Sequence, residues 1–259
     1  MIKVTVWNEY FHDDPECEKS DEVTLATHPN GLHETVAEIV RELGDEVEVR
    51  TAVQKDPEHG LSQEVLDNTD VLIWWGHMAH DLVEDEIVER VHKRILEGMG
   101  LIALHSAHYS KIFKKINGTT CSLKWRDSTY ERIFTTCPTH PIAAGIPLNF
   151  EIGVEECYGE FFDIAKPDDV IFEGWFDVGE VFRSGCTWQR GWGKIFYFQP
   201  GHETNTAYWN PYVRRIIQNA VKWCYNPAVR PYMDAPRIKT TLEDKRLNGA
   251  DGPYTRHYN

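Results

Sequence analysis

The sequence predicts a doubly wound α/β fold, in which helices cover both faces of a mainly parallel sheet. Two observations lead to this prediction. Continuous apolar runs typical of buried strands alternate with amphipathic helical segments, and short connections join them, a pattern typical of right-handed βαβ units. The chain has 259 residues, of which 41% are hydrophobic, so it is long enough to bury a substantial core.

The first elements alternate strand, helix and strand. Ile2–Val6 alternates apolar and polar residues as a strand does, and the polar loop after it contains His12. Residues 33–43 carry apolar side chains at helical spacing, and Gly44 ends this segment as a helix cap would. The next predicted strand is Glu46–Ala52.

Two apolar runs indicate strands that are buried on both faces. Asp70–Trp75 and Gly100–Leu104 are continuous runs of this kind. The short helical turn Gln63–Asn68 precedes the first run. Between the two runs, Glu84–Glu97 has one apolar face, with acidic residues early and basic residues late, which suits the helix macrodipole.

The second half of the chain is less regular. Tyr130–Cys137, Val170–Gly174 and Phe182–Gln189 are strand-like segments between proline and glycine turns. We interpret them as an elaboration of the same sheet. Lys194–Gln199 restores the buried-strand pattern, and Tyr212–Trp223 is predicted to be a closing helix.

A single domain is expected over residues 1–225, followed by a polar tail over residues 226–259. The tail has four prolines and almost no periodicity, so it cannot bury itself unaided. It is expected to be an extended end, or an arm that wraps a neighbouring subunit of a homo-oligomer. The six cysteines lie far apart without a C-x-x-C pair, which indicates reduced thiols rather than a zinc knuckle or a disulfide framework.

Charge and hydropathy argue against two classes of partner. The formal net charge of −14 opposes the phosphate neutralisation on which binding to nucleic acids and anionic membranes depends. No apolar run approaches the roughly 20 residues that span a bilayer, and the first ten residues are typical of a strand rather than a signal peptide. The sequence therefore predicts a cytoplasmic protein without nucleic-acid or membrane partners.

Histidines follow three of the predicted strands. Ligands of open parallel sheets bind outside the carboxyl ends of the strands, where the loops converge. Side chains that directly follow these strands are therefore expected to share one edge of the sheet. The residues concerned are His77, His80, His105, His108, His202 and Glu203.

This group of imidazoles has three interpretations. His77, His105 and His202 could bind a divalent metal such as Zn²⁺ with an open coordination position. The same imidazoles could instead transfer protons near neutral pH, oriented by a carboxylate such as Glu203. Each histidine could also merely hydrogen-bond the loop backbone, and His77 could be only a loop anchor.

Ser106 offers a further alternative, a serine nucleophile. It lies on a predicted strand-to-helix turn, but the flanking glycines of a G-x-S-x-G elbow are absent. No G-x-G-x-x-G or G-x-x-x-x-G-K-[ST] motif follows a strand, so the sequence indicates neither a dinucleotide nor a nucleoside triphosphate.

Aromatic residues near these loops are candidates for a ligand wall, because their faces stack on sugars, although most tryptophans pack in cores. Core packing is expected for Trp74, and Trp125 lies among polar residues. Glu156, beside an aromatic residue, could be an acid, a base or a metal ligand. The predicted substrate-binding residues are Trp75, Tyr158, Trp188 and Trp209.

Five segments share the order and spacing of a known family. They are Asp70–Gly76 (DVLIWWG), Gly100–Ala107 (GLIALHSA), Thr139–Gly145 (THPIAAG), Glu155–Tyr158 (EECY, where the family has D-E-L-Y) and Gly193–Glu203 (GKIFYFQPGHE). With them the chain resembles the ThuA family, which is associated with trehalose utilisation and has a class I glutamine-amidotransferase-like fold.

The resemblance implies a flavodoxin-like core and a site at its sheet edge. His105 or Ser106 would stand where amidotransferases have their nucleophilic cysteine, and His202 with Glu203 would stand near their catalytic histidine and acid. Because no cysteine occupies this place, a thiol-dependent glutamine amidotransferase is not expected. The family's link to disaccharide breakdown implies a sugar or an oxidised disaccharide as substrate.

The resulting hypothesis is a carbohydrate-related isomerase or hydrolase. A metal or an imidazolium would polarise a sugar carbonyl while a carboxylate takes the adjacent proton. The alternatives are a non-catalytic sugar-binding or regulatory module, and a serine hydrolase in which His202 is the base for Ser106. The candidate catalytic residues are His105, Ser106, Glu156, His202 and Glu203.

Overall fold

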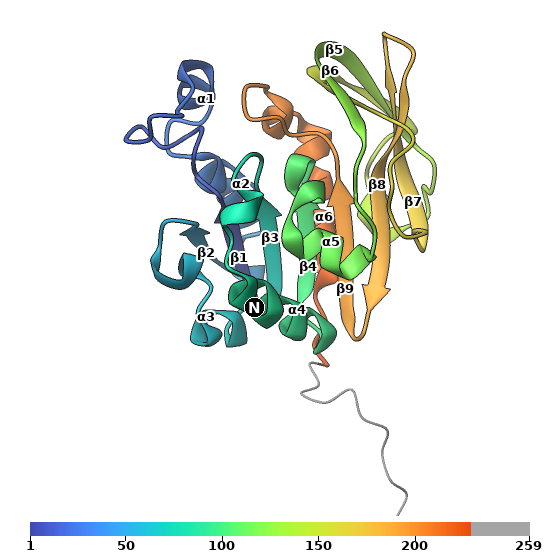
Figure 1. Ribbon diagram of the computed structural model, residues 1–259. Coiled ribbons are helices and arrows are strands. Elements are labelled where there is room, and N and C mark those ends of the chain that lie inside the picture. The colour runs from blue at the N-terminus through green and yellow to red at the C-terminus, as the bar shows by residue number, and fades with distance from the viewer. Residues whose placement is uncertain (229–259) are drawn as a thin grey trace, which may run out of the picture.

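The computed structural model describes residues 1–228 and has an α/β architecture built on one nine-stranded sheet (Figure 1). Residues 229–259, which hold most of the predicted tail, lie outside the described residues. The strands are β1 (Ile2–Asn8), β2 (Val47–Val53), β3 (Val71–Trp75), β4 (Gly100–Leu104), β5 (Lys124–Thr135), β6 (Asn149–Gly159), β7 (Asp169–Phe176), β8 (Val181–Arg190) and β9 (Gly193–Phe198). The helices are α1 (Glu22–Thr27), α2 (Leu32–Arg41), α3 (Gln63–Asp67), α4 (Asp85–Leu96), α5 (Lys111–Asn117) and α6 (Pro211–Cys224).

One half of the sheet is parallel, with the strand order β2-β1-β3-β4-β9. This is the 2-1-3-4-5 order of flavodoxin-like sheets. Every residue of β3 and β4 is buried, as their continuous apolar sequences require. The α/β class and the position of these strands are therefore as the sequence predicts.

The prediction of a mainly parallel, flavodoxin-like sheet needs a correction, because the sheet is mixed. Beyond β9 it continues through β8, β7, β5 and β6, each antiparallel to its neighbour. The connections explain this direction. Residues 177–180 join β7 to β8, and residues 191–192 join β8 to β9, and such short links cannot contain the crossover that parallel neighbours need. The irregular middle of the chain is an elaboration of the same sheet, as predicted.

Helices cover both faces of the parallel half, and two hydrophobic cores result. On one face, α2 and α6 pack against side chains such as Val6 and Ile73. On the other, α3, α4 and α5 cover a core in which Trp7 and Trp74 stack with 3.9 Å between ring centroids. Trp74 therefore packs in the core, as expected. Gly100 allows close packing of α6, since a Cβ there would lie 2.7 Å from the carbonyl oxygen of Cys224.

The sequence did not predict α1 and α5, which have six and seven residues. Such short helices show too little periodicity to be recognised, and their caps are the only local signal. Asp21 and Ser110 accept hydrogen bonds from the backbone N–H groups of Thr24 and Phe113 at the helix starts. In the part of the chain that the structure describes, no helix is both long and apolar enough to cross a bilayer.

Candidate functional site

The candidate site lies where the two halves of the sheet meet. In strand order β6 is four positions from β9, so a flat sheet would separate them by about 19 Å. Nevertheless, Gln199 Nε2, just after β9, donates a hydrogen bond of 3.0 Å to the carbonyl oxygen of Glu156 on β6. The antiparallel half therefore curls back toward the carboxyl ends of the parallel strands. In Figure 1, β5 and β6 reach above the level of β3 and β4.

His105, the first residue after β4, is fully buried and held at both ring nitrogens. Its Nδ1–H donates to the carbonyl oxygen of Gln199 at 2.8 Å. Its Nε2 lies 2.9 Å from Glu156 Oε2 and 3.3 Å from the Tyr158 hydroxyl. The backbone of His105 has a φ of 51°, a left-handed conformation that few non-glycine residues adopt. The turn thus aims the imidazole at β6.

The His105–Glu156 pair is charged. Burial lowers the pKa of His105, but the hydrogen bond and negative charge of Glu156 outweigh burial and raise this pKa to about 9. Burial likewise raises the pKa of Glu156, yet the His105 imidazolium outweighs it, so the pKa of Glu156 falls below its ordinary value. Near neutral pH the site therefore contains an imidazolium beside a carboxylate.

Glu155, the neighbour of Glu156, fixes the loop after β9. Its fully buried carboxyl group accepts hydrogen bonds from the backbone N–H groups of Gly201 at 3.0 Å and His202 at 3.2 Å, and from Asn205 Nδ2 at 3.1 Å. Burial raises its pKa above the ordinary value. Glu155 was not among the predicted site residues. The only signal for it in the sequence is its place beside Glu156 in the E-E-C-Y segment.

The third strand end contributes His77, after β3. Its Nδ1 hydrogen-bonds Glu203 Oε1 at 2.8 Å. Burial raises the pKa of Glu203, but the hydrogen bond with His77 outweighs burial and lowers that pKa to about 2. The ring of His77 lies 6.5 Å from that of His105 and 5.7 Å from that of His202, and the latter two are 5.4 Å apart, measured between centroids. The structure therefore brings the three predicted imidazoles together.

Two sets of side chains in the described chain could bind a metal ion. Within each set, one ligand atom per residue lies within 4.8 Å of the others. The sets are His105, Glu156 and His202, and His12, His77 and Glu203. The predicted metal ligands His77, His105 and His202 are thus divided between two neighbouring sets. Each set combines imidazole and carboxylate donors, which suit Zn²⁺ and related divalent cations.

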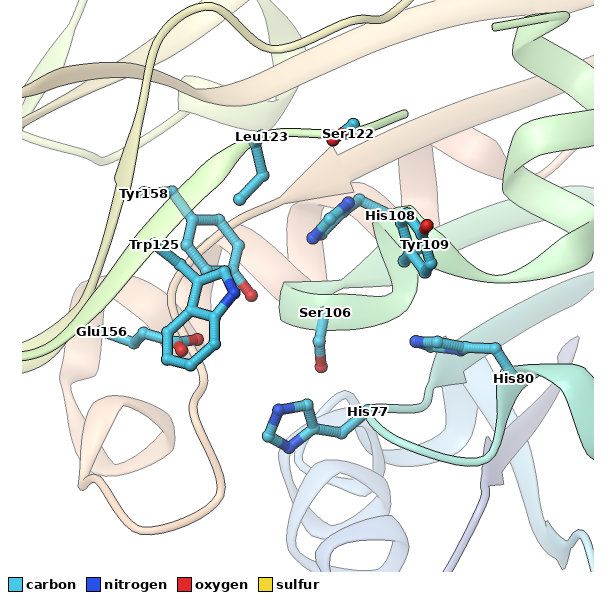
Figure 2. A pocket seen from close by; sticks show the side chains of 10 residues that line it. All are labelled: His77, His80, Ser106, His108, Tyr109, Ser122, Leu123, Trp125, Glu156 and Tyr158. Carbon is cyan, nitrogen blue, oxygen red and sulfur yellow. The ribbon is translucent and has the colours of Figure 1, made fainter. Parts of the chain in front are cut away.

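A pocket of about 400 Å³ opens beside these residues, a size that suits a small molecule. Ser106 points into it (Figure 2), and the Ser106 hydroxyl has no hydrogen-bond partner among residues 1–228. A second pocket of about 420 Å³ shares His77, Trp125 and Glu156 with the first and adds His202. Trp125 is 64% exposed, so its indole is available to a ligand in either pocket.

Of the four aromatic residues predicted to bind substrate, only some lie at these two pockets. Tyr158 lines the first pocket. Trp75 is buried, and its indole N–H donates to the carbonyl oxygen of Gly201 at 3.2 Å. Trp188 is buried against Phe113. Trp209 is exposed at a separate hollow beside α1.

His80 and His108 also line the first pocket. Burial lowers the pKa of His80 to about 4 and that of His108 to about 3, so both are neutral. His108 Nδ1–H donates to the carbonyl oxygen of Cys121 at 2.8 Å, and this bond fixes its ring. These two histidines give the pocket wall polar, uncharged groups.

Comparisons with known proteins agree with the sequence pattern. The family model "ThuA: Trehalose utilisation" matches residues 22–224. No curated protein matches the chain.

Solved structures show the same fold at low identity. A ThuA-like protein from Parabacteroides merdae has a TM-score of 0.63 and 14% identity, with 97% of this chain and 94% of that chain covered. A cytoplasmic protein from Salmonella typhimurium LT2 has a TM-score of 0.58 and 11% identity, with 87% and 100% covered. A β-galactosidase from Bacillus circulans sp. alkalophilus has a TM-score of 0.54 and 12% identity, with 91% and 32% covered.

Proposed function

This chain belongs to the ThuA family, whose description is trehalose utilisation, and from this premise we propose that it is a carbohydrate-related enzyme. Its substrate is a sugar or an oxidised disaccharide that carries a carbonyl group. Its reaction is isomerisation or hydrolysis at the group formed by His105, Glu156 and His202. We further propose a cytoplasmic location and a homo-oligomer, and light scattering by the full chain tests the latter.

The observation that carries this proposal is the buried ion pair of His105 and Glu156 beside an open pocket. Burying two charges is costly, and apolar side chains of similar volume would stabilise a fold at least as well. Charged groups with strongly shifted pKa values in a pocket are instead typical of catalytic sites. Glu156 lines both pockets, so its carboxylate can reach a bound ligand.

The residues suggest how a carbonyl-bearing sugar would react. Glu156 would remove a proton from the hydroxyl-bearing carbon next to the carbonyl group, which gives an enediolate, and would return this proton to the former carbonyl carbon. The hydroxyl proton would pass to the former carbonyl oxygen, so that the carbonyl and hydroxyl groups exchange places, which is an isomerisation. Burial and the nearby His105 imidazolium lower the pKa of His202. This neutral imidazole would hydrogen-bond the substrate oxygen as its charge develops. His105 itself lies behind Glu156 and keeps it ionised.

A divalent cation could supply the same polarisation. His105 is oriented as metal-bound histidines are, since one ring nitrogen donates to a carbonyl oxygen while the other faces the candidate ligands. His202 Nδ1 is 2.9 Å from the Thr204 hydroxyl, so its Nε2 is the nitrogen left for the site. Zn²⁺ bound by His105, Glu156 and His202 would polarise a carbonyl oxygen as a Lewis acid. Glu156 would then bind the cation through one carboxylate oxygen, and its other oxygen would remain for proton removal.

The experiment that tests this function is solvent-deuterium exchange. Oxidised keto derivatives of trehalose are incubated with the enzyme in D₂O, and NMR records deuterium at the carbon next to the carbonyl group. Trehalose itself has no carbonyl group and is the negative control. Glu156→Gln should reduce exchange and turnover at least about a hundredfold, because a general base contributes 10²–10⁴-fold. Glu151→Gln is the matched control, since Glu151 is exposed on the same strand. Equal rates for wild type and Glu156→Gln would contradict the assignment.

Two other functions give different results in the same experiments. A non-catalytic sugar-binding module, which the exposed Trp125 beside the pocket favours, would bind the sugars without exchange or turnover. A serine hydrolase would react with a phosphonate at Ser106, and mass spectrometry would detect the adduct. The unpartnered hydroxyl of Ser106 argues against this reaction, because no base holds it within residues 1–228.

A further inference from the structure

His12, His77 and Glu203 form a cluster beside the site described above, and the proposed reaction gives them no role. They come from three loops, which follow β1, β3 and β9. Glu203 Oε1 is 2.8 Å from His77 Nδ1 and 3.9 Å from His12 Nδ1. The two imidazole rings stack, with 5.1 Å between centroids and 25° between planes. Three loops thus converge on a single carboxylate.

Two polar atoms of this cluster are buried without a hydrogen bond. Glu203 is only 3% exposed, and its Oε2 has no partner in the described part of the chain. His12 Nε2 is buried and equally without a partner among the described residues. A buried polar atom without a hydrogen bond destabilises the fold, and more so when it is charged. Such atoms call for an explanation, and a missing ion is one of them.

The unpartnered oxygen of Glu203 lies toward the first candidate set. Glu203 Oε2 is 3.8 Å from His202 Nε2, whereas Oε1 contacts His77. The His77 and His202 rings are 5.7 Å apart between centroids. Glu203 therefore lies between the two sets, with Oε1 toward His77 and Oε2 toward His202.

We propose that His12, His77 and Glu203 bind a second divalent cation, and that Glu203 bridges it to a cation held by His105, Glu156 and His202. The donors lie within 4.8 Å of one another, and tetrahedral Zn²⁺ with ligands at about 2.1 Å needs them about 3.4 Å apart. Bringing the widest pair of donors to this separation needs a relative movement of up to about 1.4 Å. The second cation, with three protein ligands, would keep a coordination position for substrate or water, and the first, with four, would take substrate as a fifth ligand. The proposal deepens the proposed function and rests on the same pocket.

Metal titration tests the second site without an activity assay. Untagged full-length protein is stripped with chelator and titrated with ZnCl₂, by calorimetry and by metal analysis after dialysis. Wild type should bind two equivalents. His12→Ala and Glu156→Gln should each bind one, because each removes a ligand from a different set. Glu203→Gln should weaken both equivalents at least tenfold. His92→Ala, on α4 beside Lys115 and Glu89, is the matched control and should keep two.

The outcomes separate this proposal from the function above. One equivalent in wild type that His12→Ala leaves unchanged would overturn the second site and leave the first set intact. No binding at all would overturn both cation sites, whereas deuterium exchange would still test proton transfer by Glu156. Circular dichroism checks that each variant folds. Should His12→Ala unfold, His12→Gln keeps the volume of the side chain, and two retained equivalents in it would contradict the proposal.

Discussion

The two halves of the sheet contribute different chemistry to one site. The parallel half supplies histidines at its strand ends, among them His77, His105 and His202, where loops of α/β sheets meet by topology. The antiparallel half supplies the carboxylates Glu155 and Glu156 from β6. It reaches the site only because it curls back over β9. The comparison teaches that strand order alone places these imidazoles, whereas the positions of Glu155 and Glu156 depend on the curvature of the sheet.

The largest expected effect comes from cutting the link between the halves. Glu155→Ala removes the acceptor for the N–H groups of Glu156, Gly201, His202 and Asn205. We expect the free energy of unfolding to fall by about 3 kcal/mol, because buried donors lose their partner. Turnover per folded molecule should fall at least about a hundredfold, since the loop that carries His202 is released. Urea unfolding and the enzyme assay measure the two losses.

Glu155→Gln is the matched control for this link, because the amide keeps one acceptor oxygen in a side chain of the same shape. Its loss of stability should be smaller than that of Glu155→Ala. Hydrogen exchange at the Gly201 and His202 amides should accelerate more in Glu155→Ala than in Glu155→Gln. If exchange at both amides stays at the wild-type rate in Glu155→Ala, the Glu155 carboxyl group does not hold the loop after β9 against the antiparallel half.

A second prediction concerns the interior of the antiparallel half. Glu131 on β5 is fully buried, and burial together with the charge of Glu155 raises its pKa well above the ordinary value of 4.5. The folded protein therefore binds this proton more tightly than the unfolded chain. The resulting stability is present below pH 4.5 and is lost as pH rises from there to the folded-state pKa. Glu131→Gln keeps a neutral group at all pH values and should remove this loss.

Urea unfolding over a pH series measures this effect. Above pH 4.5, the variant should gain about 1.4 kcal/mol per pH unit relative to wild type, the value for one proton. Glu173→Gln, at an exposed position on the neighbouring strand β7, should follow wild type. Parallel pH profiles of wild type and Glu131→Gln would show that Glu131 does not hold a proton in the folded state.

The fold was predictable to the extent that its signals are local. The buried strands β3 and β4 were found from apolar runs and the helices α2, α4 and α6 from their spacing. The antiparallel direction of β5 to β8 depends on turn lengths, which become clear only when the strand ends are known. The aromatic residues show the same limit. Trp75 and Trp188 were predicted to bind substrate, but both are buried. A tryptophan beside a loop has the same local sequence whether it packs in a core or lines a pocket, so the sequence does not distinguish the two cases.

The candidate site was predictable in part for the same reason. His105 directly follows β4, and His202 lies in the loop after β9, so topology brings both to one edge of the sheet. His12 was noted only as a loop residue, and its approach to Glu203 depends on how the loop after β1 folds. Glu155 and Glu131 lie on strands of the antiparallel half, and their roles depend on contacts with residues more than 40 positions away. No periodicity or motif records such contacts.

The smallest expected effect is at the surface of the parallel half, and it sharpens the contrast with the buried Glu155 link. Lys115 on α5 and Glu89 on α4 form an ion pair of 2.7 Å, with side chains 32% and 64% exposed. Water screens exposed pairs, and ordering two long side chains costs entropy, so such pairs contribute about 0.2–1 kcal/mol. Lys115→Met should therefore lower the free energy of unfolding by less than about 1 kcal/mol, and a double-mutant cycle with Glu89→Gln isolates the pair. A coupling energy as large as the loss in Glu155→Ala would mean that surface charge, and not packing, holds α4 and α5 together.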